Sequence, residues 1–215
     1  MKWLTVAMAA FIISSPPLPP LALAALEPPS VPPYPDGSGA MGVTQTMTEA
    51  QFIQTTFLDP HNSKITGEMV VSMRSWYGIA PLWTLTILGA ETSLGDTDPK
   101  VGGRLVGANN FGCIKSGDKS TPWGRLSTGT ILVGGKRWWI YPSAWVGMAA
   151  WGRLIKIGPT HSPGYYLDHL RAGDWRGWAE MYYGKNVGGF EKYLANILKI
   201  EASFKAKANA AGFAW

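Results

Sequence analysis

The chain has 215 residues, of which 46% are hydrophobic and 15% are charged, and its formal net charge at pH 7 is +5. A chain of this length can bury one sizeable core, and its composition is typical of a globular protein. The positive charge favours an anionic partner, either nucleic acid or a cell-wall polymer. The basic residues are scattered, whereas a nucleic-acid-binding protein would cluster them, so nucleic acid is not expected as the partner.

The first 24 residues have the three parts of a secretory signal peptide. Lys2 precedes an apolar run from Trp3 to Ile13, and a proline-rich stretch leads to the triplet Ala22-Leu23-Ala24. Cleavage is therefore expected after Ala24. The apolar run is too short to span a bilayer, and no later segment is long and apolar enough. These features predict an exported protein, secreted, periplasmic or associated with the cell wall, with no stable membrane insertion. An uncleaved anchor is the alternative.

The next segment, residues 25–47, is rich in Pro, Gly and Ser and is expected to be an extended linker. Thr48 and Gln51 have the spacing of a capping box, which predicts the start of the first helix. The folded domain is expected to cover residues 48–204 and to be followed by a C-terminal tail at residues 205–215.

Further elements follow in the domain. A second helix is predicted from Thr66 to Tyr77, with Gly78 as its stop, and Pro81 is a suitable first residue for a third. The segment T-G-T-I-L-V-G-G-K-R-W-W-I-Y predicts a β-hairpin that turns at two glycines. Ser143 is a good N-cap for a helix over 144–157. Helical patterns return at 165–171, 175–183 and 190–204. The predicted fold class is α+β, mostly α, with one hairpin.

Glu91 stands at the end of the third helix, in G-A-E-T-S-L-G. It follows Leu88 by three residues and Ile87 by four, so helical phase places it on the side that the helix buries. Burial disfavours an ionised carboxylate, and the negative end of the helix dipole acts in the same direction, so the pKa of Glu91 should be raised. This is the environment of a general acid. The alternative is a solvated glutamate at a fraying helix end.

The other reactive side chains give no indication of a cofactor. Cys113 is the only cysteine, so neither an internal disulfide nor a thiolate metal cluster can form, and a small buried apolar residue is the simplest interpretation. The three histidines lack a metal-ligand spacing and are interpreted as structural or solvated: His61, His161 and His169. The glycine-rich segment after residue 100 has no G-K-[ST]. No metal or cofactor is expected.

Aromatic residues are candidates for sugar binding. The chain has 11 tryptophans, most of which are expected in the core. Trp138, Trp139 and Tyr141 lie along the second hairpin strand, where alternate side chains point to opposite faces. One face of this strand must therefore point away from the core. The three rings either line a cleft that binds the flat faces of sugars or are ordinary core residues.

Five features follow one another along the chain in an order that is hard to obtain by chance: A-E-T-S-L-G, N-N-F-G-C-I-K, the hairpin, W-W-I-Y-P-S-A-W-V-G-M-A-A-W-G-R-L-I and Y-Y-G-K-N-V-G-G-F-E-K-Y-L-A-N-I. Together they resemble the glucosaminidase-type peptidoglycan hydrolases of glycoside hydrolase family 73, in the lysozyme-like superfamily. The resemblance covers about Thr48 to Phe204. It implies a lysozyme-like helical domain with its hairpin flanking a cleft, and an endo-β-N-acetylglucosaminidase-like activity on the β-1,4 linkages of peptidoglycan glycan strands.

The resemblance also implies roles for individual residues. Glu91 matches the family's catalytic glutamate in its A-x-E-S-x-x-G motif, and Tyr183 or Tyr182 matches a tyrosine that faces this glutamate. Tyr183 is the candidate that would hydrogen-bond the acetamido group of the substrate. The candidates for substrate binding, which include the hairpin tryptophan, are Asn110, Phe111, Trp138, Tyr141, Ser143 and Tyr182.

The hairpin lacks the second acid that many members of the family carry there. Glycoside hydrolysis usually uses two carboxylates, and the candidates for the second are Asp118, Asp96 and Asp98, each of which can equally be an ordinary loop or capping acid. If none contributes, Glu91 would act with the substrate's own N-acetyl group. Alternatively, the chain is a lytic transglycosylase, in which the 6-hydroxyl of N-acetylmuramic acid attacks, or a non-catalytic glycan-binding or virion module.

Overall fold

The computed structural model describes residues 47–98, 103–159 and 164–215, which belong to one compact unit. The predicted signal peptide at 1–24 and all but the last residue of the predicted linker at 25–47 lie outside the described residues. Within these ranges, none of the helices combines the length and apolar character that a membrane span requires.

The first helix begins at the predicted capping box. The Gln51 N–H donates to Thr48 Oγ1 over 3.2 Å, and the Thr48 N–H donates to Gln51 Oε1 over 2.9 Å. This helix, α1 (Glu49–Ile53), continues as the π-helix η3 (Gln54–Leu58) and ends in the 3-10 turn η4 (Asp59–His61).

The next two helices also have the predicted ends. Thr66 caps α2 (Gly67–Tyr77) by accepting a hydrogen bond from the Met69 N–H at 3.3 Å. Gly78 ends α2 with φ 73°, in the left-handed region that favours glycine. Pro81 opens α3 (Pro81–Thr92), where its missing N–H costs no hydrogen bond. Helix α3 packs against both α2 and α8 (Phe190–Ala210), so its end lies between other elements.

The predicted hairpin and the helix after it are confirmed. Strands β1 (Gly129–Val133) and β2 (Lys136–Ile140) are antiparallel, with Thr130 opposite Trp139. The connecting pair Gly134 and Gly135 has φ 58° and 74°, which suits a two-residue turn between twisted strands. Helix α5 (Ala144–Ile157) starts after Ser143 as predicted.

The remaining elements are short, apart from α8. The turn η5 (Ser93–Gly95) follows α3, α4 (Arg104–Gly107) and η6 (Gly124–Leu126) precede the hairpin, and α6 (Leu167–Arg171) and α7 (Trp175–Ala179) follow α5. The predicted helix at 175–183 is divided, because after α7 the chain widens into the π-helix η7 (Glu180–Gly184). The described part of the chain is thus mostly helical with a small antiparallel sheet.

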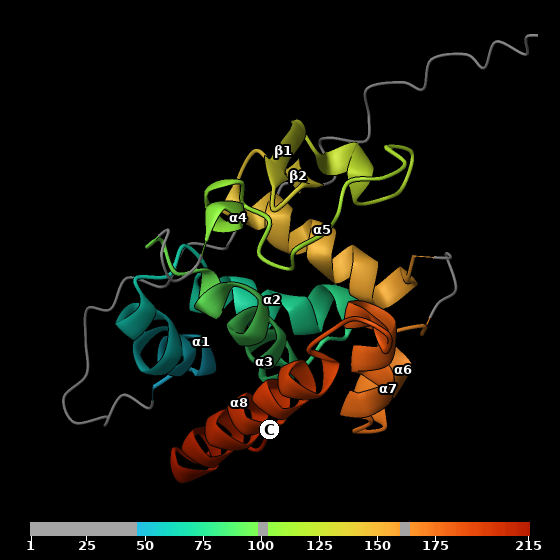
Figure 1. Cartoon of the computed structure of the whole chain (residues 1–215). Helices are drawn as coiled ribbons and strands as arrows, with labels where there is room; N and C mark the ends of the chain where they lie inside the picture. The colour runs from blue at the N-terminus through green and yellow to red at the C-terminus, as the bar shows by residue number, and fades with distance from the viewer. Residues whose placement is uncertain (1–46, 99–102, 160–163) are drawn as a thin grey trace, which may run out of the picture. The chain divides into compact units, whose positions relative to one another are not determined.

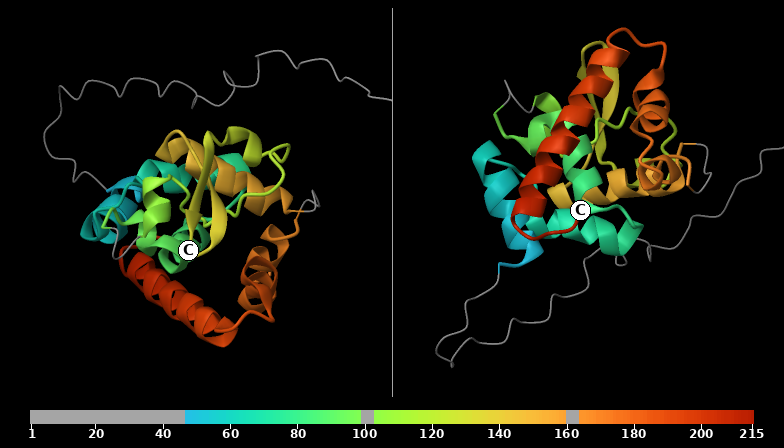
Figure 2. Two further views of the ribbon diagram at one scale, coloured as in Figure 1. Left: turned by 45° about the horizontal axis from the view of Figure 1, so that its top comes forward. Right: turned by 90° about the horizontal axis from the view of Figure 1, so that it is seen from below.

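The hairpin and α8 lie at opposite ends of the unit, with α2 and α3 between them (Figure 1). Figure 2 shows α8 crossing one side of the unit, with α6 and α7 near its first turns. The core between these elements is mostly aliphatic but includes large aromatic side chains: Trp151 and Trp178 are fully buried. The end of α3 therefore meets elements that are distant in the sequence.

The expectation of a C-terminal tail at residues 205–215 is wrong. Helix α8 continues to Ala210, and the ring of Phe213 stacks on that of Phe52 at 4.7 Å between centroids. Trp215 donates from its indole to Glu49 Oε1 over 2.9 Å. Glu49 also binds Arg74 of α2 over 2.7 Å. The last residues thus join α8 to α1. The sequence does not indicate this contact, because residues 205–211 are mostly alanine and lysine.

We predict that Trp215→Ala lowers the free energy of unfolding by roughly 2 kcal/mol, because it removes an aromatic side chain from a half-buried cluster. Chemical unfolding in urea measures this change, and Ala214→Ser, at an exposed neighbouring position, serves as the control. Equal stability of the two variants would show that the C-terminus does not stabilise the domain.

Candidate functional site

Glu91 lies in the last turn of α3, and the chain reverses direction directly after it. Ser93 and Leu94 have φ of 50° and 61°, a left-handed conformation that costs a residue other than glycine on the order of 1 kcal/mol. Ser63 holds this reversal by donating its hydroxyl to the Leu94 carbonyl over 2.5 Å. The strained turn fixes where the helix stops and so where Glu91 points.

Two donors and one cation surround Glu91, which is partly buried. The Tyr193 hydroxyl donates to Glu91 Oε1 over 2.5 Å, and the Cys113 thiol lies 3.7 Å from the Glu91 carbonyl oxygen. Burial raises the pKa of Glu91, while the bonds from Tyr193 and Cys113 and the charge of Lys115 partly oppose this rise. The predicted direction of the pKa shift is confirmed, with burial as its main cause.

Cys113 is not the ordinary core residue that the sequence suggests. It is half-buried, has φ 50°, and contributes to the surroundings of Glu91. Burial and the neighbouring Glu91 raise the pKa of its thiol well above the ordinary range. The thiol is therefore protonated at neutral pH and acts as a hydrogen-bond donor, whereas a nucleophile would need the thiolate.

Hydrogen bonds from three elements hold the N-N-F-G-C-I-K segment beside Glu91. Thr92 of α3 donates its hydroxyl to the Phe111 carbonyl over 3.1 Å, and the Asn110 amide donates to the Trp139 carbonyl over 2.9 Å. Tyr182 of η7 donates its hydroxyl to the Gly112 carbonyl. A Cβ at residue 112 would lie 2.0 Å from the Trp151 ring, so only glycine fits there.

Three of the predicted substrate-binding residues instead build this scaffold. Asn110 and Phe111 have no exposed surface, and Tyr141 is 1% exposed. Asn110 bridges Ile114 to strand β2, and burial raises the pKa of Tyr141. The prediction that these side chains contact substrate is wrong for this conformation, because Tyr141, directly after β2, and the segment of Asn110 and Phe111 both pack into the core.

The other two candidates from this region differ from each other. Trp138 is on the outward face of β2 and half-buried, with its indole donating to the Val133 carbonyl over 3.1 Å. Lys115 Nζ lies 6.0 Å from its ring centroid. Trp138 is therefore the one tryptophan of β2 with part of its ring exposed. Ser143 accepts a hydrogen bond from the Val146 N–H at 3.3 Å, which is the role of an N-cap.

The tyrosine that bonds to Glu91 is Tyr193. Neither Tyr182 nor Tyr183, the two predicted candidates, makes this bond, although Tyr182 is close enough for the charge of Glu91 to raise its pKa. Tyr182 bonds to Gly112, whereas Tyr183 donates to the Gly188 carbonyl over 3.3 Å and stacks on Tyr193 at 4.3 Å between centroids. Helical phase could have identified Tyr193 from the sequence. Tyr193 lies three residues after Phe190 and four before Ile197, both of which are buried in α8, so it is on the same face of the helix.

The candidate second acids have other partners. Asp96 accepts from the Asp98 N–H at 2.8 Å and lies 4.0 Å from His61, in a turn. Asp118 accepts from the Ser120 N–H at 2.8 Å and from the Ser120 hydroxyl at 2.6 Å. None of the described carboxylates is among the groups that shift the pKa of Glu91.

The described residues contain no group of three or more His, Cys, Asp or Glu side chains that could hold a metal ion. His169 lies 2.7 Å from Asp174 at the surface, as expected for a structural histidine. His161 lies outside the described residues.

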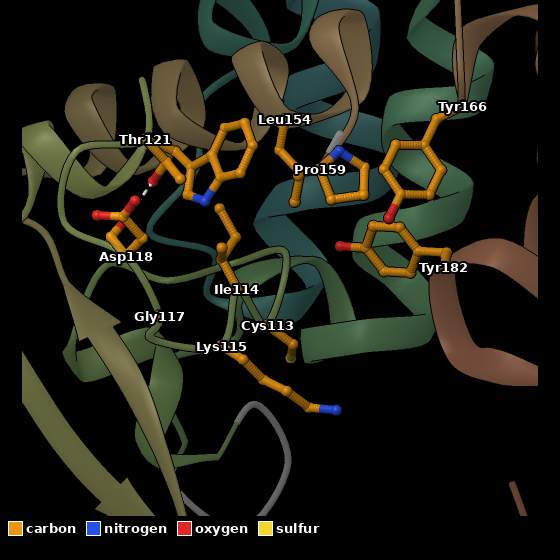
Figure 3. A pocket seen from close by; sticks show the side chains of 11 residues that line it. Cys113, Ile114, Lys115, Gly117, Asp118, Thr121, Leu154, Pro159, Tyr166 and Tyr182 are labelled. Atoms are coloured by element: carbon orange, nitrogen blue, oxygen red, sulfur yellow. Dashed lines mark hydrogen bonds between the residues drawn. The ribbon is translucent and has the colours of Figure 1, made fainter. Parts of the chain in front are cut away.

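Two hollows adjoin the partners of Glu91. The first is a cavity of about 370 Å³ between Cys113, Lys115, Asp118 and Tyr182. Figure 3 shows Tyr166 and Tyr182 at one side of it and Asp118 with Thr121 at the other. The second is a groove of about 530 Å³ along α8, lined by Tyr183, Gly189, Lys192, Tyr193 and Asn196. Cys113 belongs to the first hollow and Tyr193 to the second, and both contact Glu91.

We predict that Tyr193→Phe raises the pKa of Glu91 further, because the hydroxyl that favours the ionised carboxylate is removed. A ¹³C NMR titration of the glutamate carboxyls, with Glu91→Gln to assign the signal, measures the shift. Tyr183→Phe removes the neighbouring phenol, which does not bond to Glu91, and should leave that titration unchanged. A shift in Tyr183→Phe and none in Tyr193→Phe would contradict the observed contact.

Comparisons of the chain with protein-family models, with curated proteins and with solved structures find no match. The resemblance to glycoside hydrolase family 73 therefore rests on the quoted motifs alone.

Proposed function

We propose that the chain is an exported peptidoglycan glycosidase that cleaves β-1,4 glycan linkages, with Glu91 as its general acid. The main support is the environment of Glu91, a partly buried carboxyl group with a raised pKa that accepts a hydrogen bond from Tyr193. The A-E-T-S-L-G match implies the same residue independently. The mostly helical domain with one small hairpin is compatible with a lysozyme-like fold, which is part of this proposal.

In the proposed reaction, protonated Glu91 donates its proton to the oxygen of the glycosidic bond as the bond breaks. A raised pKa keeps this proton available near neutral pH. The carboxylate that remains accepts the Tyr193 hydroxyl, and Lys115 lowers the cost of its charge. Tyr193 therefore both orients the acid and stabilises its conjugate base.

The positive charge that develops on the sugar needs a second stabilising group. Because no described carboxylate influences the pKa of Glu91, we propose that the substrate's own N-acetyl group supplies this stabilisation and that water completes hydrolysis. The same observation favours a second candidate, lytic transglycosylation, in which the 6-hydroxyl of N-acetylmuramic acid attacks instead of water. Export is proposed from the signal-peptide features of residues 1–24.

We predict that Glu91→Gln abolishes the release of soluble fragments from purified sacculi, with a loss of at least about 100-fold, because the amide cannot donate the proton. Glu201→Gln, on the partly buried side of α8, is the matched control and should retain activity. If neither wild type nor Glu91→Gln releases fragments while both bind sacculi, the chain is a non-catalytic glycan-binding module.

Mass spectrometry of the released fragments separates the two reactions. Hydrolysis leaves reducing ends, with N-acetylglucosamine at the end for the glucosaminidase-like cleavage that we propose, whereas transglycosylation leaves 1,6-anhydro-N-acetylmuramic acid.

We also predict that Asp118→Asn lowers the rate of fragment release by less than about 10-fold, because Asp118 bonds to Ser120 and is not among the groups that shift the pKa of Glu91. Asp96→Asn and Asp98→Asn are compared in the same assay. A loss in any of the three as large as that of Glu91→Gln would identify that aspartate as the second acid.

A further inference from the structure

The groove along α8 is lined by a cationic group, an amide group and aromatic rings, a combination that suits an acidic amino sugar. Lys192 and Asn196 are exposed and lie four residues apart, so they project from the same face of the helix. Among the described residues, neither side chain has an ion pair or hydrogen-bond partner. Tyr193 and Tyr183 stack together at the groove and offer an aromatic surface.

The charge at this end of α8 is also available to a ligand. Glu191, the residue before Lys192, is held by Arg176 through bonds of 2.9 and 3.0 Å. Its charge is therefore largely matched by a guanidinium, which leaves the ammonium group of Lys192 as the uncompensated charge of the groove lining. An anionic ligand group would meet a cation there, and none of the residues that line the groove is a carboxylate.

The groove adjoins Glu91 through a single side chain. Tyr193 lines the groove with its ring and bonds to Glu91 with its hydroxyl. The consecutive residues Tyr182 and Tyr183 of η7 line the first cavity and the groove, respectively. A glycan strand that is cut at Glu91 must continue on both sides of the scissile bond, so each hollow can hold one side of it.

We propose that the groove of Tyr183, Gly189, Lys192, Tyr193 and Asn196 binds an N-acetylmuramoyl unit of the strand next to the bond that Glu91 cleaves. Lys192 binds the carboxylate that distinguishes this unit from N-acetylglucosamine, carried either by its lactyl group or by an attached stem peptide. Asn196 hydrogen-bonds the acetamido group, and the tyrosine rings contact the sugar. This inference rests on the proposed function, because it assigns a position to that substrate.

Calorimetric titration tests the site without requiring turnover. The full chain carrying Glu91→Gln is titrated with three tetrasaccharides: neutral chitotetraose, a peptide-free glycan fragment with free lactyl carboxylates, and a fragment with stem peptides. We expect at least one of the anionic fragments to bind roughly five-fold more tightly than chitotetraose at low salt. The fragment that shows this preference identifies the source of the carboxylate.

Three substitutions on α8 give the decisive comparison. Lys192→Gln should remove the preference for the anionic fragment and leave chitotetraose binding unchanged, whereas Lys192→Arg should keep it. Lys205→Gln makes the same change in net charge at an exposed position away from the groove and should also keep it. Loss of the preference in Lys205→Gln, or its persistence in Lys192→Gln, would overturn the proposal, as would no binding of any fragment.

Fragment release from sacculi tests the proposed function independently of these binding measurements. Normal release by wild type together with no effect of Lys192→Gln on binding would reject the groove and keep the glycosidase. A preference that depends on Lys192, in a wild-type chain that releases nothing, would keep the groove as a glycan-binding site and reject catalysis.

Discussion

The hydrogen bond between Tyr193 and Glu91 connects residues 102 positions apart and joins the end of α3 to the first turns of α8. It supplies a hydrogen-bond donor to a carboxyl group whose burial without a partner would be energetically costly. It also defines the boundary between the α8 groove and the surroundings of Glu91. Without α8 the end of α3 would be more exposed to solvent, and burial would raise the pKa of Glu91 less.

The second requirement is a rigid segment on the other side of Glu91. The segment from Asn109 to Lys115 has few apolar side chains of its own, and buried polar groups hold it: the amide of Asn110, the hydroxyl of Thr92 and the hydroxyl of Tyr182. Buried polar groups are costly unless each finds a partner, so this network specifies one arrangement of the segment. Residues that resemble a substrate-binding motif thus support the segment beside Glu91 from within the core.

Glu91 lines neither hollow but contacts one lining residue of each, Cys113 and Tyr193, and this limits the chemistry that can be proposed. Such a site can donate a proton, but the charge on the sugar must be met by the substrate or by an attacking hydroxyl. The two hollows differ in character. The first combines Lys115 with Asp118, whereas the lining of the α8 groove carries Lys192 as its only charge. Under the proposed function, this difference is the physical basis on which the two hollows would distinguish the two alternating sugars of the glycan strand.

The sequence by itself determined the local elements: the capping box at Thr48, the stop at Gly78, the Pro81 start, the glycine turn and the Ser143 cap all depend on neighbouring residues. It also determined that Glu91 faces inward, because helical phase is local. Tertiary structure decided which tyrosine reaches Glu91, that Asn110, Phe111 and Tyr141 are buried, that Cys113 joins the site, and that Trp215 completes the domain. These outcomes depend on packing between segments far apart in the chain, and no local pattern encodes the distances between them.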